Sequence, residues 1–333
     1  MLLGACAGNE ASSSSPGGIF IVSRSVAAVG DSHPRLLVSS APMTFVAELA
    51  RRILGGAAPA VVGLDPRLDA LPKGLLPDAD APRRIAAFYE QVLPALARHV
   101  PVVKPNIAFF ECYGSAGFAA YESTCAAARA AGMLVLGDIK RGDIGSTAEA
   151  YAEGHAKWAD AVTLHPYLGG DSLQPFLQRT HADKGGLGLF VLVRTSNPGA
   201  KDLQDLRIQD FDIALCDAVA DAVHRWGSGL PMAEGYSPVG AVVGATWPHE
   251  LERLRKRMPN AWILLPGVGA QGGKVEDLVS AFDRRGLGGL ATQSRGVMQA
   301  FQPGDADWLA KVERAAAQFA DDCRRVQQLA KSR

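Results

Sequence analysis

The segment GDIKRGDIGSTAEAY at residues 137–151 carries the residue types best suited to acid–base chemistry. It completes an apolar run at 133–140 that is typical of a strand, with Asp138 and Lys140 two residues apart. Because side chains alternate between the two faces of a strand, these two side chains should point the same way, and Asp143 follows in a glycine-rich turn. A lysine flanked by two carboxylates is expected to keep its proton at neutral pH. It would then act as a proton donor and not as a Schiff-base nucleophile.

A structural role is the alternative for the end of this segment. Asp143 or Ser146 could cap a helix that begins near Thr147, since their side-chain oxygens accept from the free N–H groups of a first helical turn. This alternative carries less weight for Asp138 and Lys140, because an acid and a base at a buried strand end must satisfy each other's charge.

The elements that must position these residues repeat eight times along the chain. Short apolar and β-branched runs end in polar or glycine-rich turns, and an Ala-rich helical pattern follows each of them. Runs with so little alternation indicate strands buried on both faces, as in a parallel sheet. Eight strand–helix units predict a (β/α)8 barrel, a TIM barrel of the α/β class, in a single domain. A doubly wound open sheet is the alternative. The expected strands are 60–65, 101–105, 133–140, 161–166, 188–195, 239–246, 262–269 and 286–295.

The barrel predicts where a site would lie, because the C-terminal ends of its strands form the catalytic face. Each polar residue there could cap a helix or be a solvated charge, but their recurrence favours a site. The polar residues at these ends are Asp65, Lys104, Asp138 with Lys140, His165, Thr195 with Ser196, Gln271, and Ser294 with Arg295.

An anion site is predicted after the last two strands. PGVGAQGG at 266–273 offers closely spaced backbone N–H groups, and Arg295 offers a planar cationic fork. Loops at this position usually hold phosphate in a TIM barrel. The same letters fit G-x-G-x-x-G, a dinucleotide-binding motif, but that motif belongs after a first strand and before a ribose-binding acid. A phosphate site is the better interpretation.

Composition excludes several classes of function. The 333 residues contain 34 Lys plus Arg and 34 Asp plus Glu, so no basic excess attracts nucleic acid or anionic lipid. No stretch reaches the roughly 18–20 apolar residues that a membrane span needs. The five cysteines are scattered without C-x-x-C, which fits a reducing cytoplasm, and no histidine spacing indicates a metal site.

The first 42 residues differ from the rest, with SSSSPGG at 12–18 and no helical or strand period. We expect residues 1–42 to be disordered or to precede the natural start, which Met43 would provide, and the barrel to span 43–333. Residues 3–6 weakly resemble a lipoprotein cleavage box, without the basic and apolar regions that precede one. TFVAELARRIL, beginning at Thr44, predicts an amphipathic helix with Thr44 as its N-cap.

Six motifs in order resemble orotidine 5′-phosphate decarboxylase, in its longer bacterial form (type 2, the mycobacterial type). The D-x-K-x-x-D segment followed by I-G-S-T is the most specific of them. The motifs are LDPR (64–67), VKPNIAFFE (103–111), GDIKRGDIGST (137–147), RTSNP (194–198), PGVGAQGG (266–273) and SRG (294–296).

The resemblance implies decarboxylation of orotidine 5′-monophosphate to UMP and CO2 in pyrimidine synthesis, with no cofactor and no metal. Lys140 would protonate C6 of the pyrimidine, and Asp138 would lie beside the substrate's carboxylate. Asp143 and Thr147 would cross a homodimer interface into the neighbouring site. Asp65 and Lys104 would hold the ribose hydroxyls and join the chain of charges. The remaining implied substrate contacts are Thr195 at the pyrimidine, Gln271 between base and phosphate, Arg295 at the phosphate, and Pro266, Gly267 and Ser294 in the loops beside it.

Two other functions stay open on the sequence. Relatives on the same barrel, such as 3-keto-L-gulonate 6-phosphate decarboxylase, share D-x-K-x-x-D but use magnesium and carry a carboxylate at the second strand end, where this chain has Lys104. A non-catalytic phosphate-binding barrel would leave Lys140 dispensable. The segment 197–237 is long for a barrel connection and could be a lid or an oligomer contact.

Overall fold

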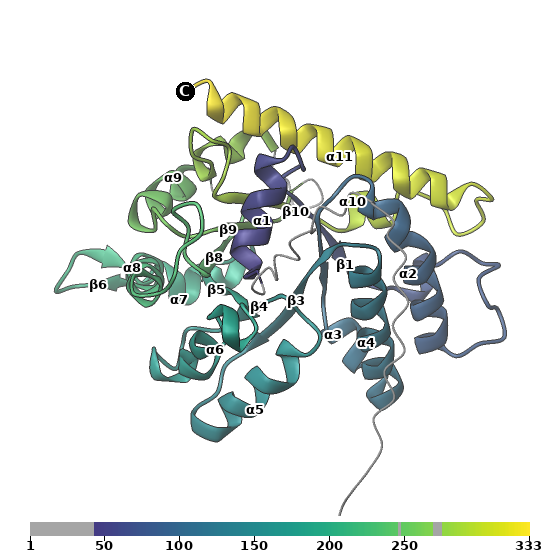
Figure 1. Cartoon of the computed structure of the whole chain (residues 1–333), viewed down its shortest axis with the longest axis horizontal. Coiled ribbons are helices and arrows are strands. Elements are labelled where there is room, and N and C mark those ends of the chain that lie inside the picture. The colour runs from purple at the N-terminus through teal and green to yellow at the C-terminus, as the bar shows by residue number, and fades with distance from the viewer. Residues whose placement is uncertain (1–42, 246–247, 269–274) are drawn as a thin grey trace, which may run out of the picture. The chain divides into compact units, whose positions relative to one another are not determined.

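Eight parallel strands form a closed barrel in the computed structural model (Figure 1), which describes residues 43–245, 248–268 and 275–333. The described residues belong to one compact unit. The prediction for residues 1–42 lies outside them, as does Gln271. The barrel strands are β1 (Ala60–Leu64), β2 (Val102–Pro105), β3 (Leu134–Arg141), β4 (Ala161–Leu164), β5 (Gly188–Arg194), β8 (Val239–Val243), β9 (Ile263–Pro266) and β10 (Gly289–Gln293).

Each strand of the barrel pairs with its neighbours in chain order, and β10 pairs with β1 to complete the ring. The predicted TIM barrel is therefore confirmed, and the open-sheet alternative is wrong. Each predicted strand is present, although several end earlier than expected. Ser294 follows β10, and Arg295 opens a short helix, α10.

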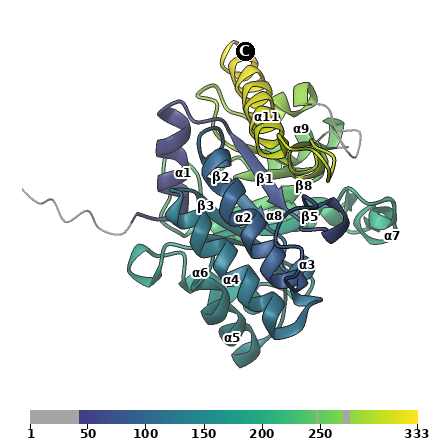
Figure 2. The same ribbon diagram turned by 90° about the vertical axis from the view of Figure 1, so that its right-hand side faces the viewer.

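Helices follow the strands and form the outer layer. The amphipathic α2 packs against both α4 and α11, so the outer helices support one another as well as the strands (Figure 2). The helices of the outer layer are α2 (Ala81–Ala97), α3 (Ala108–Glu111), α4 (Gly114–Ala130), α5 (Gly145–Ala156), α6 (Gln174–Gln178), α7 (Lys201–Gln204), α8 (Leu215–Ser228), α9 (Pro248–Arg257), α10 (Arg295–Met298) and α11 (Trp308–Lys331).

A further helix, α1 (Phe45–Leu54), precedes the first strand. The predicted cap is confirmed, because Oγ1 of Thr44 accepts from the backbone N–H of Ala47 at 3.3 Å. The apolar face of α1 packs against the start of β5, where a Cβ on Gly188 would come within 2.4 Å of the Phe45 ring. The helix therefore covers the N-terminal end of the barrel.

Side chains that alternate between the two faces of the strands form two separate apolar clusters. In β1, Val62 packs with the outer helices, whereas Val61 joins α1 and residues of the other strands inside the barrel. Leu134 and Leu136 of β3 belong to the same inner cluster. Because the side-chain period of a strand is two, the next inward residue of β3 is Asp138. The polar site thus forms the layer above an apolar interior.

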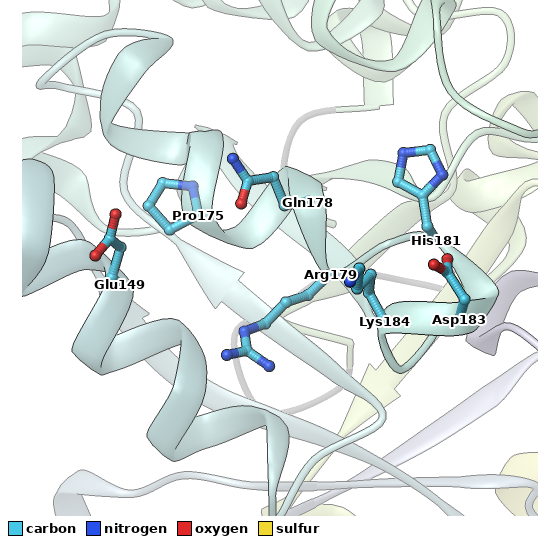
Figure 3. Close-up of a pocket in the computed structure, with 7 residues that line it drawn as sticks. All are labelled: Glu149, Pro175, Gln178, Arg179, His181, Asp183 and Lys184. Atoms are coloured by element: carbon cyan, nitrogen blue, oxygen red, sulfur yellow. The ribbon is translucent and has the colours of Figure 1, made fainter.

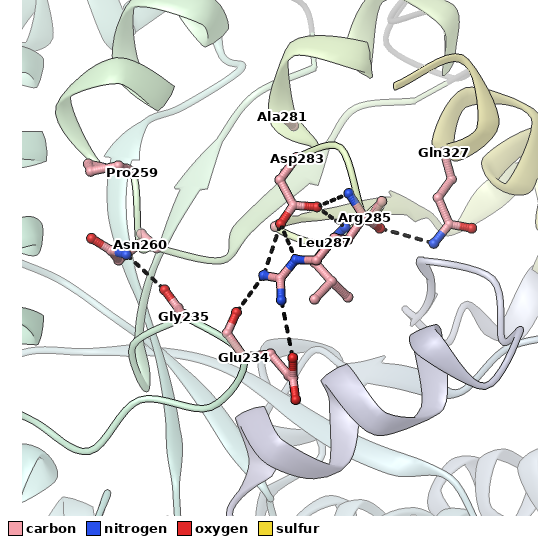
Figure 4. A network of polar contacts seen from close by, with 12 residues as sticks. Glu234, Gly235, Pro259, Asn260, Ala281, Asp283, Arg285, Leu287 and Gln327 are labelled. Carbon is pink, nitrogen blue, oxygen red and sulfur yellow. Dashed lines mark hydrogen bonds and ion pairs between the residues drawn. The ribbon is translucent and has the colours of Figure 1, made fainter. Parts of the chain in front are cut away.

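Polar contacts join the loops at the N-terminal ends of the later strands (Figure 4). The Arg285 guanidinium lies 3.1 Å from a carboxylate oxygen of Glu234 and 3.1 Å from one of Asp283. The side-chain amide of Gln327, on α11, donates to the carbonyl of Gly286 at 3.0 Å. These bonds connect the entries to β8 and β10 with the last helix, at the end of the barrel opposite the polar residues.

The segment 197–237 is ordered and contains α7, a two-stranded hairpin of β6 (Arg207–Ile208) and β7 (Ile213–Ala214), and then α8. Arg194 at the end of β5 is fully buried and pairs with Asp205 of this segment at 2.8 Å. It also pairs with Glu250 of α9 at 2.7 Å. The segment is therefore fixed to the barrel through a buried arginine.

No helix in the described part of the chain is long and apolar enough to cross a membrane.

Candidate active site

Asp138 lies at the centre of the charged site, between two lysines. Nζ of Lys104, at the end of β2, is 2.6 Å from Oδ2 of Asp138. Nζ of Lys140 contacts the other carboxylate oxygen. The side chains of Asp138 and Lys104 are less than a tenth exposed, whereas that of Lys140 is 46% exposed. Lys140 therefore combines a buried counter-ion with access to a ligand.

The charges set the protonation of the buried pair. Burial alone would raise the pKa of Asp138. The positive charges of Lys104 and, after it, Lys140 have a larger combined effect and hold the pKa of Asp138 well below its usual range. Burial alone would lower the pKa of Lys104, but Asp138 and then Asp65 outweigh it and raise the pKa. Asp138 is thus an anion and Lys104 a cation at neutral pH.

Lys140 has an unusual backbone for a residue with a side chain. Its φ is +45°, in the left-handed region, which costs on the order of 1–3 kcal/mol outside glycine. The pairing of β3 with β4 shifts register between Gly137 and Arg141, so the lysine lies in a bulge. The regular alternation of side chains along a strand predicts that Asp138 and Lys140 point the same way, but the bulge interrupts this alternation. The two side chains nevertheless contact each other.

Two adjoining cavities open at the C-terminal ends of the strands, and they share Lys104 and Pro266. One, of about 410 Å³, is lined by Asp138, Lys140 and Thr195. The other, of about 310 Å³, contains four more of the predicted residues: Asp65, Gly267, Ser294 and Arg295. The predicted residues therefore divide into a lysine–carboxylate half and a second half beside the predicted phosphate loop.

The second half has the features of an anion pocket. Gly267 has φ +100°, which glycine adopts without strain. Oγ of Ser294 donates to the carbonyl of Gly63 at 3.1 Å, an approach that a side chain on Gly63 would block. Arg295 is exposed, and Arg67, whose guanidinium lies 6.0 Å from the centre of the Phe109 ring, lines the same cavity. The sequence did not indicate Arg67 as a ligand residue, although it lies in the LDPR motif.

Asp143 and Thr147 do not line either of these cavities. Oδ1 of Asp143 accepts from the backbone N–H of Ile144 at 2.8 Å, and Thr147 is exposed. The helix of this segment, α5, begins at Gly145 and includes Thr147, and no side chain caps its first turn. The capping alternative for Asp143 and Ser146 is therefore wrong.

Thr195 is held by the neighbouring segment. Its backbone N–H donates to Oε1 of Gln204 at 2.9 Å, and the amide of Gln204 donates back to its hydroxyl at 2.8 Å. The Thr195 hydroxyl itself donates to Asn197 at 2.7 Å. Ser196, which the sequence also places at this strand end, lines the same cavity. Thr163 also lines it and was missed, because a threonine within a strand looks like an ordinary β-former.

A larger cavity, of about 510 Å³, lies between α5 and the segment 174–184 and shares no lining residue with these two cavities (Figure 3). Its charged residues are Glu149, Asp183, Arg179 and Lys184, which are two of each sign. Such a lining does not favour an anionic ligand. Among the residues that the structure describes, no group of three or more His, Cys, Asp or Glu side chains could hold a metal ion.

The closed barrel, the contacts of Lys104 and Lys140 with the buried Asp138, and the adjoining cationic pocket at the C-terminal strand ends are typical of a TIM-barrel enzyme. The sequence model of the orotidine 5′-phosphate decarboxylase / HUMPS family matches residues 62–306. The chain belongs to this family.

Similar proteins agree with this assignment. The chain is 44% identical over 271 residues to an orotidine 5′-phosphate decarboxylase from Rhodopirellula baltica, covering 77% of this chain and 88% of that protein. It resembles the structure of Leishmania donovani UMP synthase (TM-score 0.70, 35% identity, 86% of this chain and 57% of that chain). It also resembles Leishmania donovani OMP decarboxylase (TM-score 0.68, 33% identity, 84% and 98%). The chain thus spans little more than half of the first structure and nearly all of the second.

Proposed function

We propose that this chain decarboxylates orotidine 5′-monophosphate to UMP and CO2, the step that ends pyrimidine nucleotide synthesis, with Lys140 as the proton donor. The proposal depends above all on one observation. The half-exposed Lys140 is paired with the buried Asp138, in a cavity that adjoins a cationic pocket with room for a phosphate. Family membership and relatives of that name support the choice of substrate.

The reaction requires stabilisation of a carbanion without a cofactor. When the bond from C6 to the carboxylate breaks, its electron pair stays on C6 and CO2 leaves. Nζ of Lys140 then delivers a proton to C6, and the neutral amine regains a proton from solvent. A cation already held in place by Asp138 stabilises the developing charge electrostatically. The Asp138 carboxylate would lie beside that of the substrate, where repulsion could favour its departure.

The remaining predicted residues would bind the nucleotide. Lys104 lines both cavities and Asp65 lines the second one, and both would contact the ribose hydroxyls. Thr195 would contact the pyrimidine. Phosphate would be held by residues of the last two loops, and the energy of that contact could order the site for the reaction. The proposed phosphate residues are Pro266, Gly267, Gln271, Ser294 and Arg295.

A homodimer is part of the proposal, with Asp143 and Thr147 reaching the site of the partner. An exposed apolar side chain next to Asp143 supports it, since Ile144 is 57% exposed. The carboxylate of Asp143 accepts only the N–H of Ile144 among the hydrogen bonds of the described residues, so it remains available to a neighbour. We place the enzyme in the cytoplasm, in keeping with four free cysteines in the described part of the chain.

A magnesium-dependent reaction of the same family is the second candidate. The ammonium group of Lys104 occupies the second strand end and is already paired with Asp138. A cation at this place would repel a metal ion, which makes this candidate the weaker one.

One assay separates the candidates. Purified protein is mixed with orotidine 5′-monophosphate in excess chelator, and loss of the orotate absorbance is followed. Turnover that is unaffected by chelator is the expected result. Absence of turnover would contradict the proposed function, and turnover abolished by chelator would favour the metal-dependent reaction.

A further inference from the structure

The bulge in β3 leaves an unusual pairing with β4. Gly137 pairs with Val162 and Arg141 pairs with Leu164, so the three residues 138–140 stand opposite Thr163 alone. An inserted residue in a strand loses its partner in the ladder of backbone hydrogen bonds. The backbone N–H of Lys140 therefore needs another acceptor, because an unpaired buried N–H is costly.

The side chain of Thr163 supplies that acceptor. Its Oγ1 accepts from the backbone N–H of Lys140 at 3.0 Å. The same hydroxyl donates to Oδ1 of Asp138 at 3.0 Å. Oδ1 is also the carboxylate oxygen that contacts Nζ of Lys140. One hydroxyl thus fixes both the backbone of the lysine and the carboxylate that orients its ammonium group.

We propose that Thr163 is a positioning residue for the decarboxylation, which holds Lys140 in its left-handed backbone conformation and Asp138 in the orientation that pairs with it. This inference rests on the proposed role of Lys140. The geometry is rigid, since the Thr163 side chain is only 1% exposed and its single proton is directed to Asp138.

The side-chain hydroxyl is the group that matters in this role. Valine has nearly the same shape as threonine but can neither accept from Lys140 nor donate to Asp138, so Thr163→Val removes both bonds while the volume stays filled. Serine keeps the hydroxyl and loses only a methyl group. Thr163→Ser should therefore restore what Thr163→Val loses.

The experiment compares Thr163→Val with Thr163→Ser and with Thr180→Val. Thr180 is an equally buried threonine whose hydroxyl donates to a backbone carbonyl, that of Leu177, outside the site. In Thr163→Val we expect kcat to fall about 10- to 100-fold, the cost of a reacting group displaced by up to an ångström. The Kd of UMP should change less than about threefold, because the nucleotide is held by other residues. Thr163→Ser should stay within about threefold of the wild-type kcat, and Thr180→Val should match the wild type in both quantities.

Several results would overturn the proposal. They are a Thr163→Val variant with the kcat of Thr180→Val, an equal loss of kcat and UMP affinity, and a serine variant as slow as the valine variant. If Thr163→Val does not fold, Thr163→Ala takes its place, and failure of both to fold would assign the hydroxyl to stability instead. Wild-type turnover tests the proposed function separately. If the wild-type protein shows no turnover, the proposed function is wrong. If the wild type turns over and Thr163→Val has an unchanged kcat, only the inference about Thr163 is wrong.

Discussion

Lys104 and Asp138 form a buried ion pair, with 2.6 Å between Nζ and Oδ2 and less than a tenth of either side chain exposed. Removing one partner of such a pair leaves an uncompensated charge in the interior. The pair therefore couples the stability of the barrel to the protonation of its site.

The pH dependence of stability should report this coupling. The lowered pKa of Asp138 means that its contribution is complete above the ordinary value of about 4 and is lost as the pH falls from there towards the folded-state value. The raised pKa of Lys104 means that its contribution is complete below about 10.4 and is lost as the pH rises through the folded-state value. Denaturant unfolding of Asp138→Asn at pH 7 should show a loss of about 3–5 kcal/mol.

The difference between Asp138→Asn and the wild type should stay constant from about pH 5 to 9 and narrow in acid. Asp183→Asn is a suitable control, because Asp183 is exposed and forms no ion pair with any described residue. A difference that persists unchanged at pH 3 would show that the charge of Asp138 is not what stabilises the site.

Replacement of Lys140 should separate catalysis from binding. In Lys140→Ala we expect kcat to fall at least about 1,000-fold, since both the proton donor and its electrostatic stabilisation are lost. The Kd of UMP, measured by calorimetry, should rise much less, because the second cavity is intact. Lys157→Ala removes an exposed lysine that pairs with Glu153 at 3.7 Å and should leave both quantities unchanged. Substantial turnover in Lys140→Ala would rule out the lysine as the proton donor.

Mixed dimers test whether Asp143 acts in the partner's site. Asp138→Ala and Asp143→Ala should each be inactive alone. In a hybrid, one site would lack both carboxylates and the other would have both. An equal mixture that reassorts freely should therefore recover roughly a quarter of the wild-type activity. If hybrids are detected by native mass spectrometry and no activity returns, Asp143 acts within its own subunit.

Gln204 should matter for binding of the base, although it lies in the segment 197–237 and not on a strand. Loss of its two hydrogen bonds to Thr195 in Gln204→Ala should loosen the end of β5. We expect the Kd of UMP to rise about 5- to 10-fold, as for the loss of a hydrogen bond of 1–1.5 kcal/mol. The affinity for ribose 5-phosphate, which lacks the base, should not change.

Gln209→Ala provides the matched control for Gln204. Gln209 is an exposed glutamine of the same segment, in the turn between β6 and β7. If the two variants bind UMP equally well, the contacts of Gln204 with Thr195 have no part in recognition of the base.

The strand count and the positions of most site residues could be predicted from the sequence, because both follow from local periodicity. Apolar runs of strand length identify the barrel, and the residue two positions after an inward Leu136 must be the inward Asp138. The motif order then places Lys104 and Asp138 at neighbouring strand ends, where the structure pairs them.

The bulge at Lys140 could not be predicted in this way. Its positive φ depends on the register of β3 against β4, and the residue that accommodates it, Thr163, is 23 positions away along the chain. The start of α5 at Gly145 was missed for a related reason. A glycine with φ +52° indicates a turn as well as it indicates the first residue of a helix.

Ion pairs between residues that are far apart along the chain also could not be predicted from the sequence. Arg194 looks like one more polar residue at the end of a strand, yet it is buried and pairs with carboxylates 11 and 56 residues later. Nothing in the local pattern of the segment 197–237 identifies those partners. Only the packed barrel shows that this segment supports the wall of the site.

The position of helix α1 affects the route by which substrate and products enter and leave the barrel. Phe45 and Leu49 belong to the apolar cluster inside the barrel, so the axis is blocked from the N-terminal end. In the part of the chain that the structure describes, the cavities beside Lys140 open at the opposite end, so orotidine 5′-monophosphate, UMP and CO2 would pass through that end. CO2 needs only a narrow gap there, whereas UMP would have to break the proposed contacts to its phosphate before it leaves. Departure of the nucleotide is thus the step that resets the site for another turnover.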